Sequence, residues 1–171
     1  GDVQSDYSKG LTQFFKEEFS KLGGRVVAEE SYTQTDQDFK SQLTKIRDLN
    51  PDVLYVPGYY GQVGIIAKQA RELGMNMPIL GGDGWDSPEL WKLGGAALQN
   101  SYISNHYSAD NPAPEIQNFI KAYQAKYGAV PDSLAALAYD AAKVLADSLK
   151  RAGGSEPQKL RDAIAATNNF Q

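Results

Sequence analysis

Apolar positions along the chain follow two spacings, one typical of helices and one typical of short buried strands. Apolar residues three or four positions apart predict helices at 6–22, 39–49, 61–73 and 88–93. Short apolar segments bounded by turn residues predict strands at 25–31, 53–56, 78–80 and 101–105. This alternation predicts an α/β fold, in which a parallel sheet of about four strands carries helices on both faces.

The pattern changes after His106. Residues 108–114 read SADNPAP, and three helical patterns follow this proline-rich segment without a strand between them. We therefore divide the chain into an α/β part at 1–103, a linker at 104–111 and an all-helical part at 112–171. The three helices have apolar faces but no sheet of their own to cover. Since exposed apolar patches usually mark interaction sites, we expect these faces to dimerise or to associate with another segment.

Two predicted strands end in turns that carry aromatic and acidic residues. The strand VLYV is followed by Tyr59 and Tyr60, and the strand PIL is followed by GGDGWD, which contains Asp83 and Trp85. In an open parallel sheet, ligands bind in the crevice at the carboxyl ends of the strands. The two turns therefore predict a small-molecule binding site.

Each of these residues also has a structural explanation. Asp83 can pair with a ligand ammonium, but it can equally cap the next helix or form an Asx-turn. The glycines around it would let the backbone approach a ligand closely. Of Tyr59 and Tyr60, one ring is expected to pack on the neighbouring helix. Trp85 either lines the pocket or covers the end of the sheet.

Composition narrows the range of functions. The chain has 171 residues, a net charge of −4 and no cysteine, which excludes disulfides and thiolate chemistry. Lysine and arginine are scattered, so nucleic acid is not an expected partner. His106 is the only histidine. A metal site formed by His106 with Asp83 and Asp86 has no characteristic spacing, and we interpret His106 as a solvated loop residue.

The sequence lacks the motifs of common catalytic sites. It contains no G-x-S-x-G elbow and no phosphate-binding P-loop, and GGDGWD does not match the dinucleotide-binding pattern. We therefore expect a binding protein rather than an enzyme, with no cofactor and no metal.

Four segments together resemble one family of binding proteins. They are DYSKG (6–10), PDVLYVPGYYGQVGIIAKQARELG (51–74), PILGGDGWDS (78–87) and SLAALAYDAAKVLADSLKRAGG (133–154). The resemblance is to the branched-chain amino-acid-type (leucine/isoleucine/valine-binding-like) type I periplasmic substrate-binding proteins of ABC transporters. It covers nearly the whole chain, and the PGYYG and GGDGWDS turns are its most specific part.

The resemblance implies two Rossmann-like (flavodoxin-like) lobes that close on a ligand without a reaction. It implies that Tyr59 faces the ligand, that Asp83 holds the α-ammonium of an amino acid and that Tyr7 lies at the cleft edge. Trp85 would form a wall of the side-chain pocket. Many members have glutamate where Asp83 stands, so the size of the ligand can differ.

The resemblance also implies that this chain is a fragment. It would contain the second, C-terminal lobe without its first strand, and the helices at 112–171 would pack on the absent first lobe. The whole protein would be periplasmic or otherwise extracytoplasmic, either lipid-anchored or secreted, although this chain contains no signal peptide. It would deliver a small or aliphatic amino acid to the membrane subunits of an ABC permease.

Two other functions remain open from the sequence. The same scaffold can serve as a sensing domain for an amino acid, an amide or an aromatic acid. A flavodoxin-like enzyme or nucleotide binder is a further alternative, but SDYSKG lacks the glycine pattern of a phosphate-binding loop.

Overall fold

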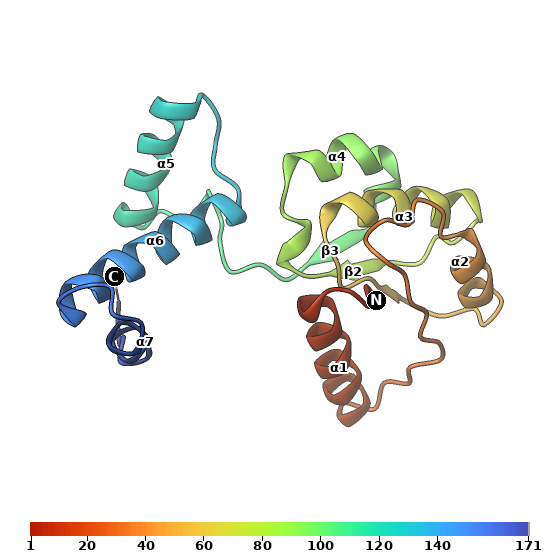
Figure 1. Cartoon of the computed structure of the whole chain (residues 1–171). Coiled ribbons are helices and arrows are strands. Elements are labelled where there is room, and N and C mark those ends of the chain that lie inside the picture. The colour runs from red at the N-terminus through yellow and green to blue at the C-terminus, as the bar shows by residue number, and fades with distance from the viewer. Residues whose placement is uncertain (171) are drawn as a thin grey trace. The chain divides into compact units, whose positions relative to one another are not determined.

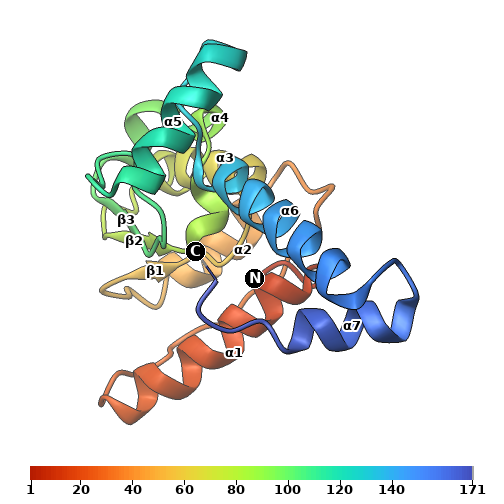
Figure 2. The same cartoon turned by 90° about the vertical axis from the view of Figure 1, so that its left-hand side faces the viewer.

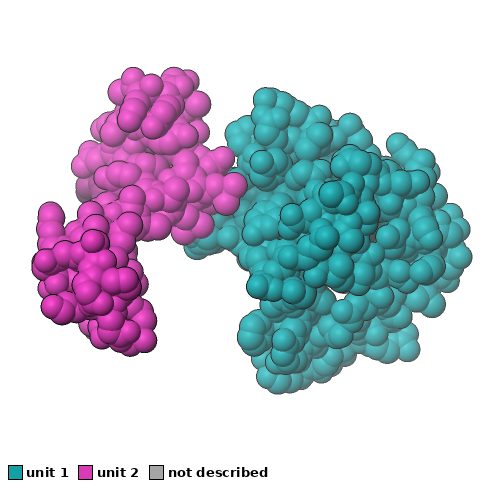
Figure 3. Space-filling view, in the orientation of Figure 1, with its two compact units in different colours: residues 1–106 teal, residues 107–171 magenta. Residues whose placement is uncertain are grey.

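The computed structural model describes residues 1–170 and divides into two compact units. The first unit is Gly1–His106 and the second begins at Tyr107, inside the range predicted as the linker. Figure 3 colours the first unit teal and the second magenta.

A small parallel sheet lies at the centre of the first unit (Figure 1). Its strands are β1 (Leu54–Tyr55), β2 (Ile79–Gly81) and β3 (Ser101–Ile103), in the order β1-β2-β3. Leu54 is paired with Ile79, and Ile79 with Ser101. The parallel sheet confirms the predicted α/β class.

Helices cover both faces of this sheet, as Figures 1 and 2 show. On one face lie α2 (Lys40–Arg47), α3 (Tyr60–Glu72) and α4 (Pro88–Gly94), and α4 packs against α3. On the opposite face lies α1 (Asp6–Lys21), whose Phe15 stacks on Tyr55 of β1 with 4.0 Å between ring centroids. Two short 3-10 turns, Asp83–Trp85 and Gly95–Leu98, follow β2 and α4.

The core of the first unit lies between the sheet and the layer formed by α2 and α3. Phe39, Leu43, Val63 and Ile79 are at most 3% exposed and belong to one apolar cluster. Burial of apolar side chains contributes about 1.5–3 kcal/mol for each large residue, so this cluster is the main source of stability.

One predicted strand is not formed. Residues 25–31 are extended but have no regular strand assignment, and a single parallel bridge joins Asp2 to Tyr32 at their end. The reason is geometric, because a strand needs a hydrogen-bonded neighbour along its length. Among the described residues, the one backbone hydrogen bond to this segment comes from the amino group of Gly1, which donates to the carbonyl of Glu30 near its end.

Arg71 fixes the end of α3 to two loops. Its guanidinium donates hydrogen bonds to the carbonyls of Met75 at 2.6 Å and Met77 at 2.8 Å, which precede β2. It also donates to the carbonyls of Ala97 at 3.2 Å and Gln99 at 3.0 Å, which precede β3. One side chain therefore sets the positions at which both strands begin.

The second unit contains three helices. They are α5 (Pro114–Tyr127), α6 (Ser133–Ala152) and α7 (Pro157–Ala165). The rings of Phe119 and Tyr139 connect α5 to α6, with 4.7 Å between centroids. Arg151 of α6 donates a hydrogen bond to the carbonyl of Ala163 in α7 at 2.6 Å. Within residues 1–170, no helix combines the length and apolar character that a membrane crossing requires.

We predict that Arg71→Lys lowers the free energy of unfolding by about 1–3 kcal/mol, because one ammonium cannot bond four separate carbonyls. Chemical denaturation of both proteins measures the difference. Lys68→Arg on the exposed side of α3 is the control, for which we expect no loss. Equal stability of wild type and Arg71→Lys would show that the four hydrogen bonds do not hold the loops.

We predict that Tyr32→Phe stabilises the first unit or leaves it unchanged at neutral pH. The Tyr32 hydroxyl is buried and finds no hydrogen-bond partner among residues 1–170. Burial also raises the pKa of Tyr32 above its ordinary value. The folded state therefore holds its proton while the unfolded state loses it, so wild-type stability should fall as the pH rises above about 10.

The variant should lose less stability over that alkaline range than the wild type does. Thermal unfolding between pH 7 and pH 11 tests both effects. A destabilisation of Tyr32→Phe by more than about 1 kcal/mol at pH 7 would indicate that the hydroxyl does have a partner.

Candidate functional site

Trp85 anchors the turn after β2 to the core of the first unit. The indole of Trp85 is 2% exposed, and its N–H donates a hydrogen bond to the carbonyl of Val56 at 3.0 Å. Trp85 therefore connects this turn to the end of β1. The expectation that Trp85 forms a pocket wall is corrected, because a ring inside the core of the unit offers almost no surface to a ligand.

The glycines of this turn are required by the packing of the protein on itself. A β-carbon at Gly81 would overlap the Trp85 ring, and one at Gly82 would lie 2.7 Å from the Tyr7 hydroxyl. A β-carbon at Gly84 would lie 2.8 Å from the carbonyl oxygen of Gly58. The sequence suggested that these glycines admit a ligand. In the structure, the space beside them is occupied by Tyr7, Trp85 and the neighbouring turn.

Tyr7 links the first turn of α1 to the loop after β2. Its hydroxyl donates a hydrogen bond to Oδ1 of Asp83 at 2.8 Å and accepts one from the N–H of Gly84 at 2.9 Å. Burial raises the pKa of Tyr7 well above its ordinary value, and the Asp83 carboxylate adds to this effect. The phenol therefore keeps its proton and remains the donor in its bond to Asp83.

Asp83 is partly exposed, with 29% of its side chain accessible to solvent. Its recorded side-chain hydrogen bond goes to Tyr7, and the turn that follows has no side-chain cap. The second carboxylate oxygen lies 4.0 Å from Nδ1 of His106, which is itself 48% exposed. Since a carboxylate accepts several hydrogen bonds, Asp83 can receive another donor from the solvent side.

Tyr59 and Tyr60 occupy different environments. Tyr59 is 38% exposed, and its ring stacks on Tyr7 with 5.1 Å between centroids and 27° between the planes. Tyr60 begins α3 and packs against the apolar cluster of the core. The expectation that one ring of this pair packs on the helix layer thus applies to Tyr60. Tyr59 remains beside Tyr7 and Asp83 as an accessible aromatic surface.

Two further residues contribute to the site, of which His106 was considered in the sequence only as a metal ligand or solvated loop residue, and Ser8 was missed. His106 lies close to Asp83, and Ser8 is completely buried, accepting a hydrogen bond from the N–H of Asp2 at 2.8 Å and donating one to the carbonyl of Pro57. Neither residue has a spacing signal. The position of Ser8, one residue after Tyr7 in DYSKG, is the only indication that the sequence offers.

The arrangement combines an oriented carboxylate with an aromatic surface at the carboxyl ends of two parallel strands. A carboxylate of this kind suits a cationic group such as an ammonium, and a tyrosine ring suits an adjoining apolar group. No group of three or more histidine, aspartate or glutamate side chains in residues 1–170 is placed to hold a metal ion.

Comparisons with known proteins show the family of this chain. The chain is 33% identical over 152 residues to Leu/Ile/Val-binding protein homolog 3 of Brucella melitensis, an alignment that covers 88% of this chain and 40% of that protein. It is 42% identical to the leucine-binding protein LivK of Thermotoga maritima, with a TM-score of 0.88 over 99% of this chain and 48% of LivK.

A third relative was solved with a ligand. The branched-chain amino-acid transporter substrate-binding protein LivJ of Streptococcus pneumoniae, in complex with isoleucine, is 36% identical, with a TM-score of 0.82 over 99% of this chain and 48% of LivJ. The chain thus spans less than half the length of each of these three relatives. The pattern that defines the periplasmic binding protein family matches residues 2–171, and the chain belongs to this family.

Proposed function

We propose that this chain is part of an extracytoplasmic receptor that binds a small amino acid between two lobes and delivers it to an ABC permease. The observation that carries the proposal is the Asp83 carboxylate, which Tyr7 holds in place beside the exposed ring of Tyr59. The family and the relatives named for branched-chain amino acids support the choice of ligand.

Asp83 is proposed to accept the α-ammonium of the ligand. The Tyr7 hydroxyl donates a hydrogen bond to Oδ1 of Asp83, and the solvent-exposed side of the carboxylate can accept one from the ligand. When a second lobe closes over the site and excludes water, the attraction between ammonium and carboxylate becomes stronger. Tyr59 then contacts the part of the ligand next to the ammonium, and Tyr7 positions both Asp83 and Tyr59.

The proposed receptor performs no chemical step. Ligand binding instead shifts the population of the receptor from an open form to a closed form, because the closed form binds the ligand more tightly. Contacts to the ligand carboxylate would come from the other lobe, so this chain by itself is expected to bind weakly.

We predict that Asp83→Asn, in a protein containing both lobes, weakens amino-acid binding about 10- to 100-fold, because a charge-assisted hydrogen bond becomes a neutral one. Calorimetry with leucine, isoleucine, valine and alanine measures the affinity. Asp86→Asn is the matched control on the same loop. Asp86 accepts a hydrogen bond from the Asn105 amide at 2.9 Å, and we expect little change in affinity from this substitution.

Two outcomes would contradict the proposal. Amino-acid binding by Asp83→Asn as tight as that of the wild type would show that Asp83 does not hold the ligand ammonium. Binding of benzoate without any amino acid would favour the alternative of an aromatic-acid receptor on the same scaffold.

We also propose that the helices of the second unit associate through their apolar faces. The exposed large apolar residues there include Leu134, Leu137 and Leu145 of α6 and Ile164 of α7. Apolar area of this kind is covered in the complete receptor by the other lobe, and in this chain alone by a second copy.

Sedimentation of the 171-residue chain should therefore show dimers or larger species. The double variant Leu137→Glu with Leu145→Glu should shift the chain towards monomer. Lys150→Glu on an exposed position of α6 serves as the charge control. A monodisperse monomer at all concentrations of the wild-type chain would refute the association.

A further inference from the structure

The Asp83 carboxylate has a neighbour besides Tyr7 that has no role in the proposed binding of the ligand. Oδ1 of Asp83 accepts the hydrogen bond from the Tyr7 hydroxyl, whereas Oδ2 lies 4.0 Å from Nδ1 of His106. Both side chains of this second pair are partly exposed, at 29% for Asp83 and 48% for His106. His106 therefore lies beside the carboxylate oxygen that remains for a ligand ammonium.

Hydrogen bonds hold the chain after β3 against the turn after β2. The N–H of Ser104 donates to the carbonyl of Gly81 at 3.1 Å, which continues the pairing of the two strands. The side-chain amide of Asn105 donates to Asp86 at 2.9 Å, and the N–H of His106 donates to the side-chain oxygen of Asn105 at 2.9 Å. The position of the imidazole is therefore set by the fold of this turn.

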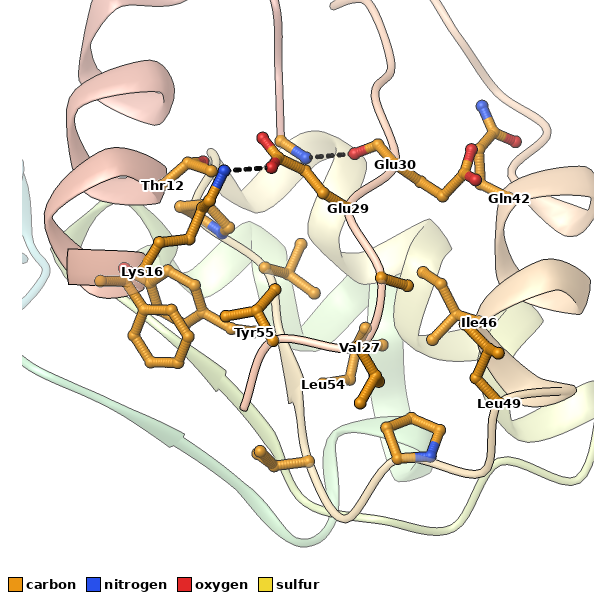
Figure 4. A pocket seen from close by; sticks show the side chains of 18 of the residues that line it. Thr12, Lys16, Val27, Glu29, Glu30, Gln42, Ile46, Leu49, Leu54 and Tyr55 are labelled. Atoms are coloured by element: carbon orange, nitrogen blue, oxygen red, sulfur yellow. Dashed lines mark hydrogen bonds and ion pairs between the residues drawn. The ribbon is translucent and has the colours of Figure 1, made fainter. Parts of the chain in front are cut away.

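The lysines of the neighbouring helices pair with other acids. Those of α1 and α4 form the pairs Lys9–Asp6, Lys16–Glu29, Lys21–Glu18 and Lys92–Glu89. Figure 4 shows the second of these pairs as a dashed line beside the cavity that Tyr55 lines. Among residues 1–170, the one basic group within 4.0 Å of the Asp83 carboxylate is the imidazole of His106.

The two phenols that interact with Asp83 keep a constant charge between pH 5 and pH 8. Burial raises the pKa of Tyr7 and the pKa of Tyr55 above their ordinary values, and the charge of Asp83 adds to both effects. Histidine is the side-chain type whose charge ordinarily changes in this pH range. A change of charge at His106 therefore acts on Asp83 without a compensating change at either tyrosine.

We infer that His106 and the ligand ammonium compete for the Asp83 carboxylate, so that amino-acid binding is coupled to the loss of a proton from His106. This inference rests on the proposed function of the site. A protonated imidazole attracts Oδ2 of Asp83 and repels an incoming ammonium, because the two cations carry like charge. A neutral imidazole leaves the carboxylate to the ligand, and the proton passes to the solvent.

The coupling has two measurable consequences. By thermodynamic linkage, a ligand that favours neutral His106 binds more weakly where His106 is protonated, and its binding releases a proton. Because both side chains are partly exposed, the effect has the size of an exposed ion pair. We therefore expect the affinity for the amino acid to be about two- to fivefold lower at pH 5.5 than at pH 8.

Calorimetry of a protein containing both lobes tests the coupling, with leucine, isoleucine, valine and alanine as ligands between pH 5.5 and pH 8. Titrations in two buffers that differ in ionisation enthalpy measure the proton release. We expect the wild type to release a fraction of a proton between pH 6 and pH 7 and to lose affinity towards acidic pH.

Two substitutions of His106 separate its charge from its hydrogen bonding. His106→Gln keeps an N–H donor beside Asp83 but cannot titrate, so the proton release and the fall in affinity should both be lost. His106→Lys carries a permanent positive charge at these pH values, so its affinity at pH 8 should be about two- to fivefold below that of the wild type. Asp86→Asn, on the same turn, is the control and should keep the wild-type pH profile.

Two results would overturn the inference while leaving the receptor function intact. One is a wild-type affinity that stays constant between pH 5.5 and pH 8. The other is the same pH profile for the wild type and His106→Gln, which would assign the effect to another group. Absence of amino-acid binding at every pH is a different result, because it would refute the receptor function itself and the inference with it.

Discussion

The Tyr7 hydroxyl takes part in two hydrogen bonds that join the start of α1 to the loop after β2. One goes to the Asp83 carboxylate and the other comes from the Gly84 N–H. The ring of Tyr7 in turn supports Tyr59, which follows β1. Three segments distant in sequence are therefore held together by one phenol. Burial raises its pKa, so the proton needed for the bond to Asp83 stays in place at physiological pH.

This arrangement depends on the placement of α1 against the sheet. The stacking of Phe15 on Tyr55 and the hydrogen bonds of Ser8 hold the helix at the free edge of β1. Displacement of α1 from the sheet would therefore separate the Tyr7 hydroxyl from Asp83.

Much of the fold could be predicted from local pattern. The apolar periodicity of 61–73 and the short strands VLYV and PIL are strong signals, and a parallel sheet follows from their alternation. The strand at 25–31 was wrongly predicted, because a strand depends on a neighbour that local pattern does not reveal.

The site could be predicted only in part. Asp83 and Tyr59 are at the expected strand ends, but sequence spacing does not distinguish a buried Trp85 from an exposed one.

The most direct test of the ammonium-binding role of Asp83 is a structure of a protein containing both lobes with leucine bound. If Asp83 has this role, the ligand ammonium nitrogen lies about 2.7–3.2 Å from an Asp83 carboxylate oxygen, and the hydrogen bond from Tyr7 is retained. An ammonium held by other groups, with Asp83 bonded to Tyr7 alone, would contradict it.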